Sequence, residues 1–97
     1  MDLSVAQKMM MEIYGQRDIS RGAYGTFLWL VEEIGELANA LRSGDGEELK
    51  KEFADVLAWL FSLANVVGVD VNEAFVSKYN FKCPKCGSNP CVCEESR

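Results

Sequence analysis

The 97-residue sequence contains no histidine, two prolines and four cysteines. Without histidine, the usual imidazole general base, Ser/His triads, His-ligated zinc and the Glu-x-x-His signature of di-iron proteins are excluded. The scarcity of proline leaves long stretches open to helix. No apolar run is long enough to span a bilayer, and the N-terminus lacks the basic and apolar regions of a signal peptide. We therefore expect a cytoplasmic protein without a membrane partner.

Basic residues are in the minority: 10 Lys and Arg stand against 15 Asp and Glu, which gives a net charge of −5. This balance disfavours broad binding to the phosphate backbone of nucleic acid, which needs a basic face. It is compatible with a small phosphorylated ligand held through metal ions. The 48% hydrophobic and 26% charged content is typical of one small globular domain rather than of a disordered chain.

Apolar periodicity predicts four helices followed by a tail. The expected helices cover residues 2–15, 22–42, 46–67 and 71–79, with a loop at 16–21. Gly15, Gly44 and Gly68 are expected helix stops, and Asp45 and Asp70 are expected N-caps. Helix 46–67 is apolar around most of its circumference, so we expect it to be buried on several sides. The expected fold class is all-α: a compact four-helix bundle over residues 1–80, with a short cysteine-rich tail over 81–97.

Acidic side chains recur at helical spacing on the two central helices. VEEIGELANAL at 31–41 and EFAD at 52–55 carry five of them. A short connection makes the two helices antiparallel neighbours. Folding them back at Gly44 pairs residues at equal heights: Glu36 with Glu52, Glu33 with Asp55, and Trp29 with Trp59.

Carboxylates gathered in a partly buried site cost several kcal/mol unless they are neutralised. Protons can do this by raising pKa values, and hard divalent cations such as Mg²⁺ do it better. The pattern therefore predicts a square of four carboxylates that binds metal, with two tryptophans one turn away. The alternative interpretation is two solvated acidic faces that never meet.

EEIGE at 32–36 followed by EFAD at 52–55 resembles the EExxE…ExxD motif of MazG-like nucleoside triphosphate pyrophosphohydrolases, of the all-α NTP pyrophosphatase superfamily. The resemblance covers roughly residues 20–80. It implies a helical bundle that assembles as a homodimer or homotetramer. It also implies Mg²⁺- or Mn²⁺-dependent hydrolysis of NTPs or dNTPs to the monophosphate and pyrophosphate, as in nucleotide-pool housecleaning.

The same resemblance assigns roles by position. The magnesium ligands would be Glu33, Glu36, Glu52 and Asp55. Glu32 would be an outer or additional-metal carboxylate, or would orient the attacking water, and these five acids are the candidate catalytic residues. The candidate substrate-binding residues are Trp29 and Trp59 as stacking platforms, and Lys78 and Asn80 for phosphate and for base or sugar. The alternatives are core packing for the tryptophans and ordinary exposure for the other two. Arg21 could reach a phosphate, although we expect it on the surface.

All four cysteines lie in the tail, as Cys83-x2-Cys86-x4-Cys91-x-Cys93. In a cytoplasmic chain this clustering first indicates a four-cysteine zinc knuckle. Disulfides are the alternative, and the short x4 and x1 spacings are unusual for a zinc ribbon. The spacing fits no common iron–sulfur signature. For the whole chain, the alternative function is a non-catalytic, zinc-bearing helical interaction module that retains the acidic metal site.

Overall fold

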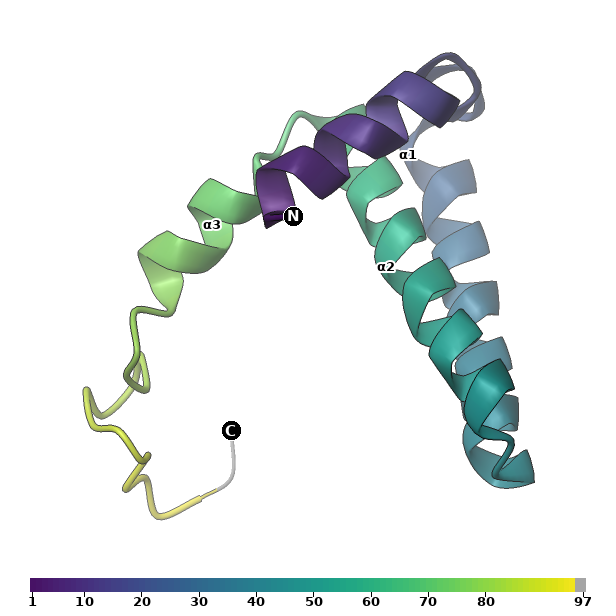
Figure 1. The fold of residues 1–97 in the computed structure, drawn as a ribbon. Coiled ribbons are helices and arrows are strands. Elements are labelled where there is room, and N and C mark those ends of the chain that lie inside the picture. Colours follow the sequence, from purple (N-terminus) through teal and green to yellow (C-terminus); the bar gives the residue numbers. More distant parts are fainter. Residues whose placement is uncertain (96–97) are drawn as a thin grey trace.

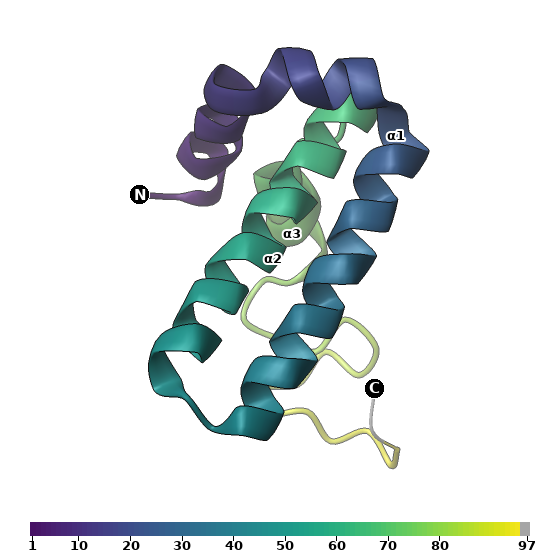
Figure 2. The same ribbon diagram turned by 90° about the vertical axis from the view of Figure 1, so that its right-hand side faces the viewer.

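The computed structural model describes residues 1–95, and in that range the chain forms three helices and no strand. They are α1 (Leu3–Ser43), α2 (Gly46–Val67) and α3 (Val71–Lys78). The second half of α1 and α2 form an antiparallel hairpin, and the first half of α1 crosses over one end of it (Figures 1 and 2). The predicted all-α class is confirmed, with three helices in place of four. Residues 96–97 of the predicted tail lie outside the described residues.

The expected loop at residues 16–21 is helical, because α1 breaks later in the sequence than predicted. Its non-helical residue is Gly22, with φ 86° and ψ 172°. That backbone region is accessible essentially only to glycine. Gly15, the expected stop, lies inside the helix, where a Cβ would come within 2.5 Å of Met11 Sδ. Gly15 therefore leaves room for the end of the flexible Met11 side chain, and Gly22 makes the bend.

The predicted ends of α2 are confirmed. Asp45 caps its N-terminus by accepting hydrogen bonds from the backbone N–H groups of Glu47 and Glu48, at 3.0 and 3.3 Å. Gly44 and Gly68, which terminate α1 and α2, adopt the left-handed conformation with φ 74° and 75°. The connection between α1 and α2 is consequently short, and this fixes the antiparallel register of the hairpin.

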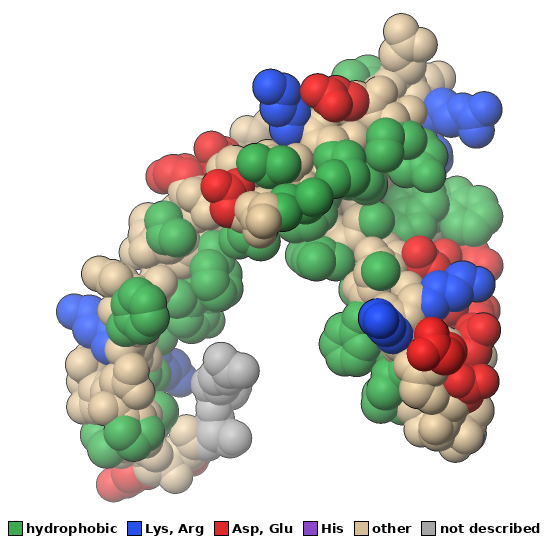
Figure 3. Space-filling model, in the orientation of Figure 1, with side chains coloured by type: hydrophobic (Ala, Val, Ile, Leu, Met, Phe, Trp, Pro, Cys, Tyr) green, Lys and Arg blue, Asp and Glu red, His purple; other side chains and the backbone are tan. Residues whose placement is uncertain are grey.

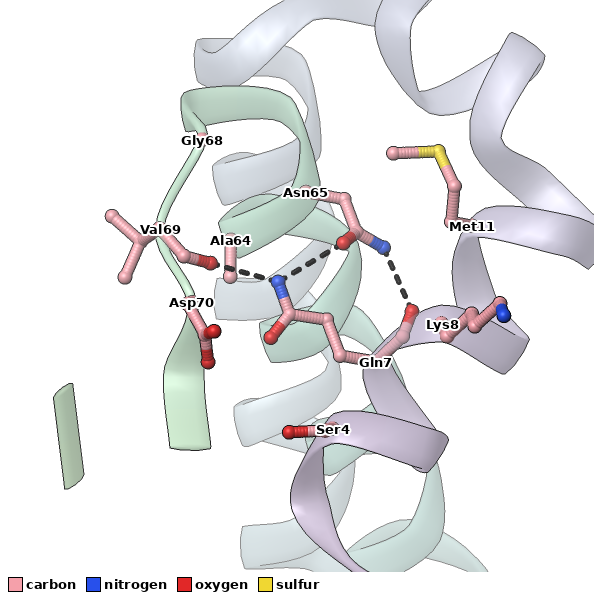
Figure 4. A pocket seen from close by; sticks show the side chains of 9 residues that line it. All are labelled: Ser4, Gln7, Lys8, Met11, Ala64, Asn65, Gly68, Val69 and Asp70. Atoms are coloured by element: carbon pink, nitrogen blue, oxygen red, sulfur yellow. Dashed lines mark hydrogen bonds between the residues drawn. The ribbon is translucent and has the colours of Figure 1, made fainter. Parts of the chain in front are cut away.

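A polar network joins the first half of α1 to the end of α2 (Figure 4). Gln7 Nε2 donates to Asn65 Oδ1 at 3.0 Å and to the Val69 carbonyl at 2.7 Å. Asn65 Nδ2 donates to the Gln7 carbonyl at 3.1 Å, and the Val71 N–H donates to Gln7 Oε1 at 3.0 Å. Each such bond contributes about 0.5–1.5 kcal/mol. Together they fix where α1 crosses the hairpin and where α3 begins.

The hydrophobic core of the single chain is small. Leu30, Ala40, Phe61 and Ala64 are its buried hydrophobic residues. The radius of gyration is 15.7 Å, against about 12.5 Å for a compact chain of this length. The expectation that helix 46–67 is buried on several sides is wrong for the single chain, because much of its apolar surface is uncovered. The hairpin on one side and α3 with the tail on the other give the molecule the shape of an arch (Figure 1). Figure 3 shows hydrophobic side chains along the inner side of this arch, and acidic side chains gathered on the hairpin.

α3 turns away from the hairpin and leads into the tail (Figure 1). The bend between α2 and α3 is 102°. Within residues 1–95 no helix is by itself long and apolar enough to cross a membrane. α2 and α3 satisfy the length and composition criteria only as a bent pair.

Candidate active site

The two tryptophans stack across the hairpin formed by α1 and α2. The ring centroids of Trp29 and Trp59 are 5.7 Å apart, with an angle of 12° between the ring planes. This stacking confirms the predicted register of the two helices. Because residues four apart lie on the same side of a helix, Glu33 and Asp55 follow the tryptophans on the facing sides of α1 and α2.

Three carboxylates meet beside the tryptophans: Glu33, Glu52 and Asp55. We call them the acidic triad, since one carboxylate oxygen of each lies within 4.8 Å of the others. Glu52 is 7% exposed, and its Oε2 has no hydrogen-bond partner among the described residues. A buried carboxylate oxygen without a partner carries a desolvation cost that a bound cation would offset.

The pKa of Glu33 is raised above its usual value of 4.5. Burial is the largest cause, followed by the negative charge of Asp55 and by a hydrogen bond with Glu52. The charges of Glu52 and Glu36 add smaller contributions in the same direction. Glu33 therefore resists ionisation in this position, and a nearby divalent cation would reverse that tendency.

The donor set of the triad fits a hard divalent cation. All its candidate ligand atoms are carboxylate oxygens, which suit Mg²⁺ and Mn²⁺. Three protein ligands leave positions in an octahedral shell for water or for substrate phosphates. The orphaned Glu52 oxygen and the raised pKa of Glu33 are both consistent with a site that takes a cation.

Glu36 and Glu32 lie outside the triad. Both side chains are exposed. Glu36 is close enough to raise the pKa of Glu33. The predicted square of four carboxylates is therefore observed as three, with Glu36 beside them on the solvent side. The roles of Glu36 as a metal ligand and of Glu32 as an outer carboxylate stay predictions.

A cavity of about 260 Å³ adjoins Asp55. Its walls come from the first half of α1 and from α2, and include Tyr14, Arg17, Asp18, Arg21, Asp55 and Trp59. One residue of the acidic triad and one of the stacked tryptophans thus open into the same space. This arrangement is suitable for a ligand with a charged end and a flat aromatic end.

Asp18 and Arg21 are held inside this cavity by each other and by their neighbours. Asp18 is 1% exposed, and its Oδ1 accepts a hydrogen bond from Arg21 Nη1 at 2.9 Å. The same nitrogen donates to Thr26 Oγ1 at 3.3 Å, and the guanidinium carbon lies 4.9 Å from the centre of the Trp59 ring. The expected surface position of Arg21 is therefore wrong.

The sequence carried one usable signal for this pair. Asp18 and Arg21 are three residues apart, the spacing of neighbours on a helix surface. Residues 16–21 were expected to form a loop, and residues three apart are not neighbours in a loop. The contact between Asp18 and Arg21 could therefore not be predicted from this spacing. Asp18 Oδ2 is buried and has no hydrogen-bond partner among the described residues.

Lys78 and Asn80 lie at the end of α3, in the part of the chain that turns away from the hairpin. Lys78 ends α3, with its Nζ 5.5 Å from the centre of the Tyr79 ring, and Asn80 is exposed. Figure 1 shows α3 and the tail diverging from the hairpin. Among the described residues of one chain, neither side chain joins the acidic triad. Their contact with substrate stays a prediction.

The tail brings its four cysteines together in a second cluster, separate from the acidic triad. All four thiols are free of disulfide bonds. The two clusters differ completely in donor type, with oxygen in one and sulfur in the other. They therefore suit different metal ions.

The protein is all-α, and carboxylates face each other across its antiparallel helical hairpin. These carboxylates lie beside a cavity with an aromatic wall and form an acidic site that could bind a metal ion. The family model of the MazG nucleotide pyrophosphohydrolase domain matches residues 23–87. The chain therefore belongs to the MazG nucleotide pyrophosphohydrolase domain family, which confirms the resemblance found in its motifs. The matched region begins directly after the break in α1 and includes the acidic triad and both tryptophans.

One similar relative is a "dATP/dGTP diphosphohydrolase" from Cyanophage S-2L. It is 46% identical over 54 residues, which make up 56% of this chain and 48% of the relative. The chain thus spans about half the length of the curated relative that it matches.

Proposed function

We propose that the chain is a nucleoside triphosphate pyrophosphohydrolase, which hydrolyses NTPs or dNTPs to the monophosphate and pyrophosphate with Mg²⁺ or Mn²⁺. The observation that carries the proposal is the acidic triad with its orphaned Glu52 oxygen, in a chain of this family. The name of the phage relative makes dATP and dGTP the first substrates to test. We further propose a housecleaning role in the cytoplasm, where surplus or non-standard nucleotides would be the substrates.

In this proposal Glu33, Glu52 and Asp55 hold the divalent cation, and Glu36 completes the ligand set from its position beside Glu33. When bound, the cation supplies the positive charge that neutralises the carboxylates and the substrate phosphates. Glu32 is the proposed outer carboxylate, which orients the attacking water or contributes to a second ion. The proposed place of zinc is the cysteine cluster.

The cavity beside Asp55 is the proposed position of the nucleotide. Trp59 offers an aromatic wall there, and Trp29 supports it from the other side of the stack. Arg21 provides a fixed positive charge in the cavity that Asp55 also lines, because Asp18 and Thr26 restrain its guanidinium. A guanidinium has five N–H donors, so further donors remain for a phosphate oxygen.

We also propose that the chain assembles as a homodimer or homotetramer. Its accessible surface is 7388 Å², whereas a folded monomer of 10.8 kDa exposes roughly 5500 Å². The excess is about twice the roughly 800 Å² that each partner buries in a standard protein–protein interface. Phe53 and Leu57 on α2 are 59% and 46% exposed and would be covered in such an assembly.

The test of the reaction is to incubate the full chain with a panel of NTPs and dNTPs and with Mg²⁺ or Mn²⁺, and to follow products by ³¹P NMR. The expected products are pyrophosphate and the monophosphate, with no turnover in EDTA. Release of inorganic phosphate and a diphosphate would contradict the proposal, because the wrong bond would have been cleaved. Absence of turnover, without any rise in Tm on adding Mg²⁺ or nucleotide, would favour the non-catalytic module.

A further inference from the structure

We propose that Cys83, Cys86, Cys91 and Cys93 form a structural zinc site that folds the C-terminal tail. One Sγ from each lies within 4.8 Å of the others. This site shares no residue with the acidic triad and does not depend on the proposed pyrophosphohydrolase activity. It accounts for the only four cysteines of the chain.

The distances between the sulfurs fit a tetrahedral ion. Four ligands at a Zn–S distance of about 2.3 Å lie about 3.8 Å apart in a tetrahedron. Cys83 Sγ and Cys93 Sγ are 3.8 Å apart, and Cys86 Sγ and Cys91 Sγ are 4.0 Å apart. A disulfide bond needs about 2.05 Å. The sulfurs are thus spaced as ligands around a common centre rather than as bonded pairs.

The backbone of the tail is shaped around the sulfurs. The Gly87 N–H donates to the Cys83 carbonyl at 2.7 Å, and the Cys83 N–H donates to the Ser88 carbonyl at 2.9 Å. Gly87 adopts φ 74°, a conformation that glycine takes without steric cost. The Cys93 N–H donates to Cys91 Sγ at 3.4 Å. Such N–H groups directed at sulfur stabilise thiolate ligands of a metal.

The charge of the cluster agrees with this geometry. Four thiolate sulfurs within 4.8 Å of one another cannot share this space unless a cation offsets their repulsion.

Within residues 81–95, little besides the cluster holds the tail in place. Phe81 and Val92, the large hydrophobic residues of this range, are 89% and 70% exposed, so the described part of the tail has no apolar core of its own. Phe81 also has φ 57°, and its carbonyl accepts a hydrogen bond from Asn89 Nδ2 at 2.7 Å. A segment this short without a core is commonly held by a metal or by disulfides. Since the thiols are free, zinc is the element that would keep the tail folded.

The metal content tests the site directly. The full chain, without a histidine tag, is purified under reducing and anaerobic conditions and analysed by inductively coupled plasma mass spectrometry. We expect about one zinc per chain, and Co²⁺ exchange should give thiolate charge-transfer bands. Cys86→Ser and Cys91→Ser should each lower bound zinc about tenfold or more. Ser88→Ala, which leaves all four ligands and the backbone in place, should retain it.

Limited proteolysis gives a second readout, because trypsin cleaves after Lys82 and Lys85. The zinc-loaded chain should resist cleavage at both positions, while the chelated chain and Cys86→Ser should be cut rapidly there. Iron in equal stoichiometry, disulfides without metal, or zinc content insensitive to both cysteine substitutions would overturn the proposal. Equal cleavage with and without zinc would overturn the folding role. Neither readout involves turnover of a nucleotide, so the two proposals fail independently.

Discussion

At the scale of single residues, Glu33 reports most directly on burial and on the repulsion within the acidic triad. Its folded-state pKa is raised above 4.5, so ionising it destabilises the folded state relative to the unfolded one. This penalty is absent below pH 4.5 and grows as the pH rises through the folded-state pKa. In metal-free protein, Glu33→Gln should therefore raise the Tm at pH 7, and the gain should vanish as the pH falls below 4.5.

Thermal melts in EDTA across this pH range measure the effect. Glu12→Gln is the matched control, because it removes one negative charge at an exposed position outside the triad. If both variants change the Tm equally at every pH, local repulsion at Glu33 is not the cause.

Part of the candidate site could be predicted from single residues of the sequence, and part could not. The pairing of Glu33 with Asp55 and of Trp29 with Trp59 follows from helical spacing and a short connection, and both are visible in the sequence. Asp18 was missed, and the contact of Arg21 with it was not foreseen, because the positions of both residues depend on where α1 breaks. Gly15 and Gly22 look alike in a sequence, yet only the packed structure shows which one bends the helix.

At the scale of elements, the break at Gly22 decides whether the first half of α1 can reach over the hairpin. A Cβ at this position would meet no atom within 4 Å, so any effect of a substitution comes from the backbone conformation alone. We expect Gly22→Ala to lower the free energy of unfolding by about 1–3 kcal/mol. Urea denaturation measures this change.

Gly35 provides the control within the same helix. It has a helical backbone, and a Cβ there would also meet no atom within 4 Å. Gly35→Ala should therefore stabilise the chain by up to about 1 kcal/mol, because alanine favours helix over glycine. Destabilisation of similar size by both substitutions would show that the positive φ of Gly22 is not what matters.

At the scale of the whole molecule, the uncovered apolar surface predicts self-association. Sedimentation or light scattering should give a dimer or tetramer at micromolar concentration, where a monomer has a mass of 10.8 kDa. Phe53→Lys should weaken assembly by about tenfold or more, because it removes an apolar contact and adds a charge. Val92→Lys also replaces an exposed apolar side chain by lysine, but in the tail, and it should leave assembly intact.

A monomeric wild-type chain at these concentrations would contradict the proposed assembly. In the sequence, the expectation of a homodimer or homotetramer came from the family resemblance. The sequence could not show how small the core of one chain is, because burial depends on how far α3 diverges from the hairpin.

We propose that the carboxylates facing each other across the hairpin form the catalytic metal site. The most direct test of this proposal is pyrophosphate release from dATP and Mg²⁺ by the wild type, by Asp55→Asn and by Glu12→Gln, with helical content checked by circular dichroism. We predict that Asp55→Asn loses at least about 100-fold in rate with unchanged helicity, while Glu12→Gln keeps wild-type activity. A folded Asp55→Asn variant that releases pyrophosphate at the wild-type rate would contradict the proposal.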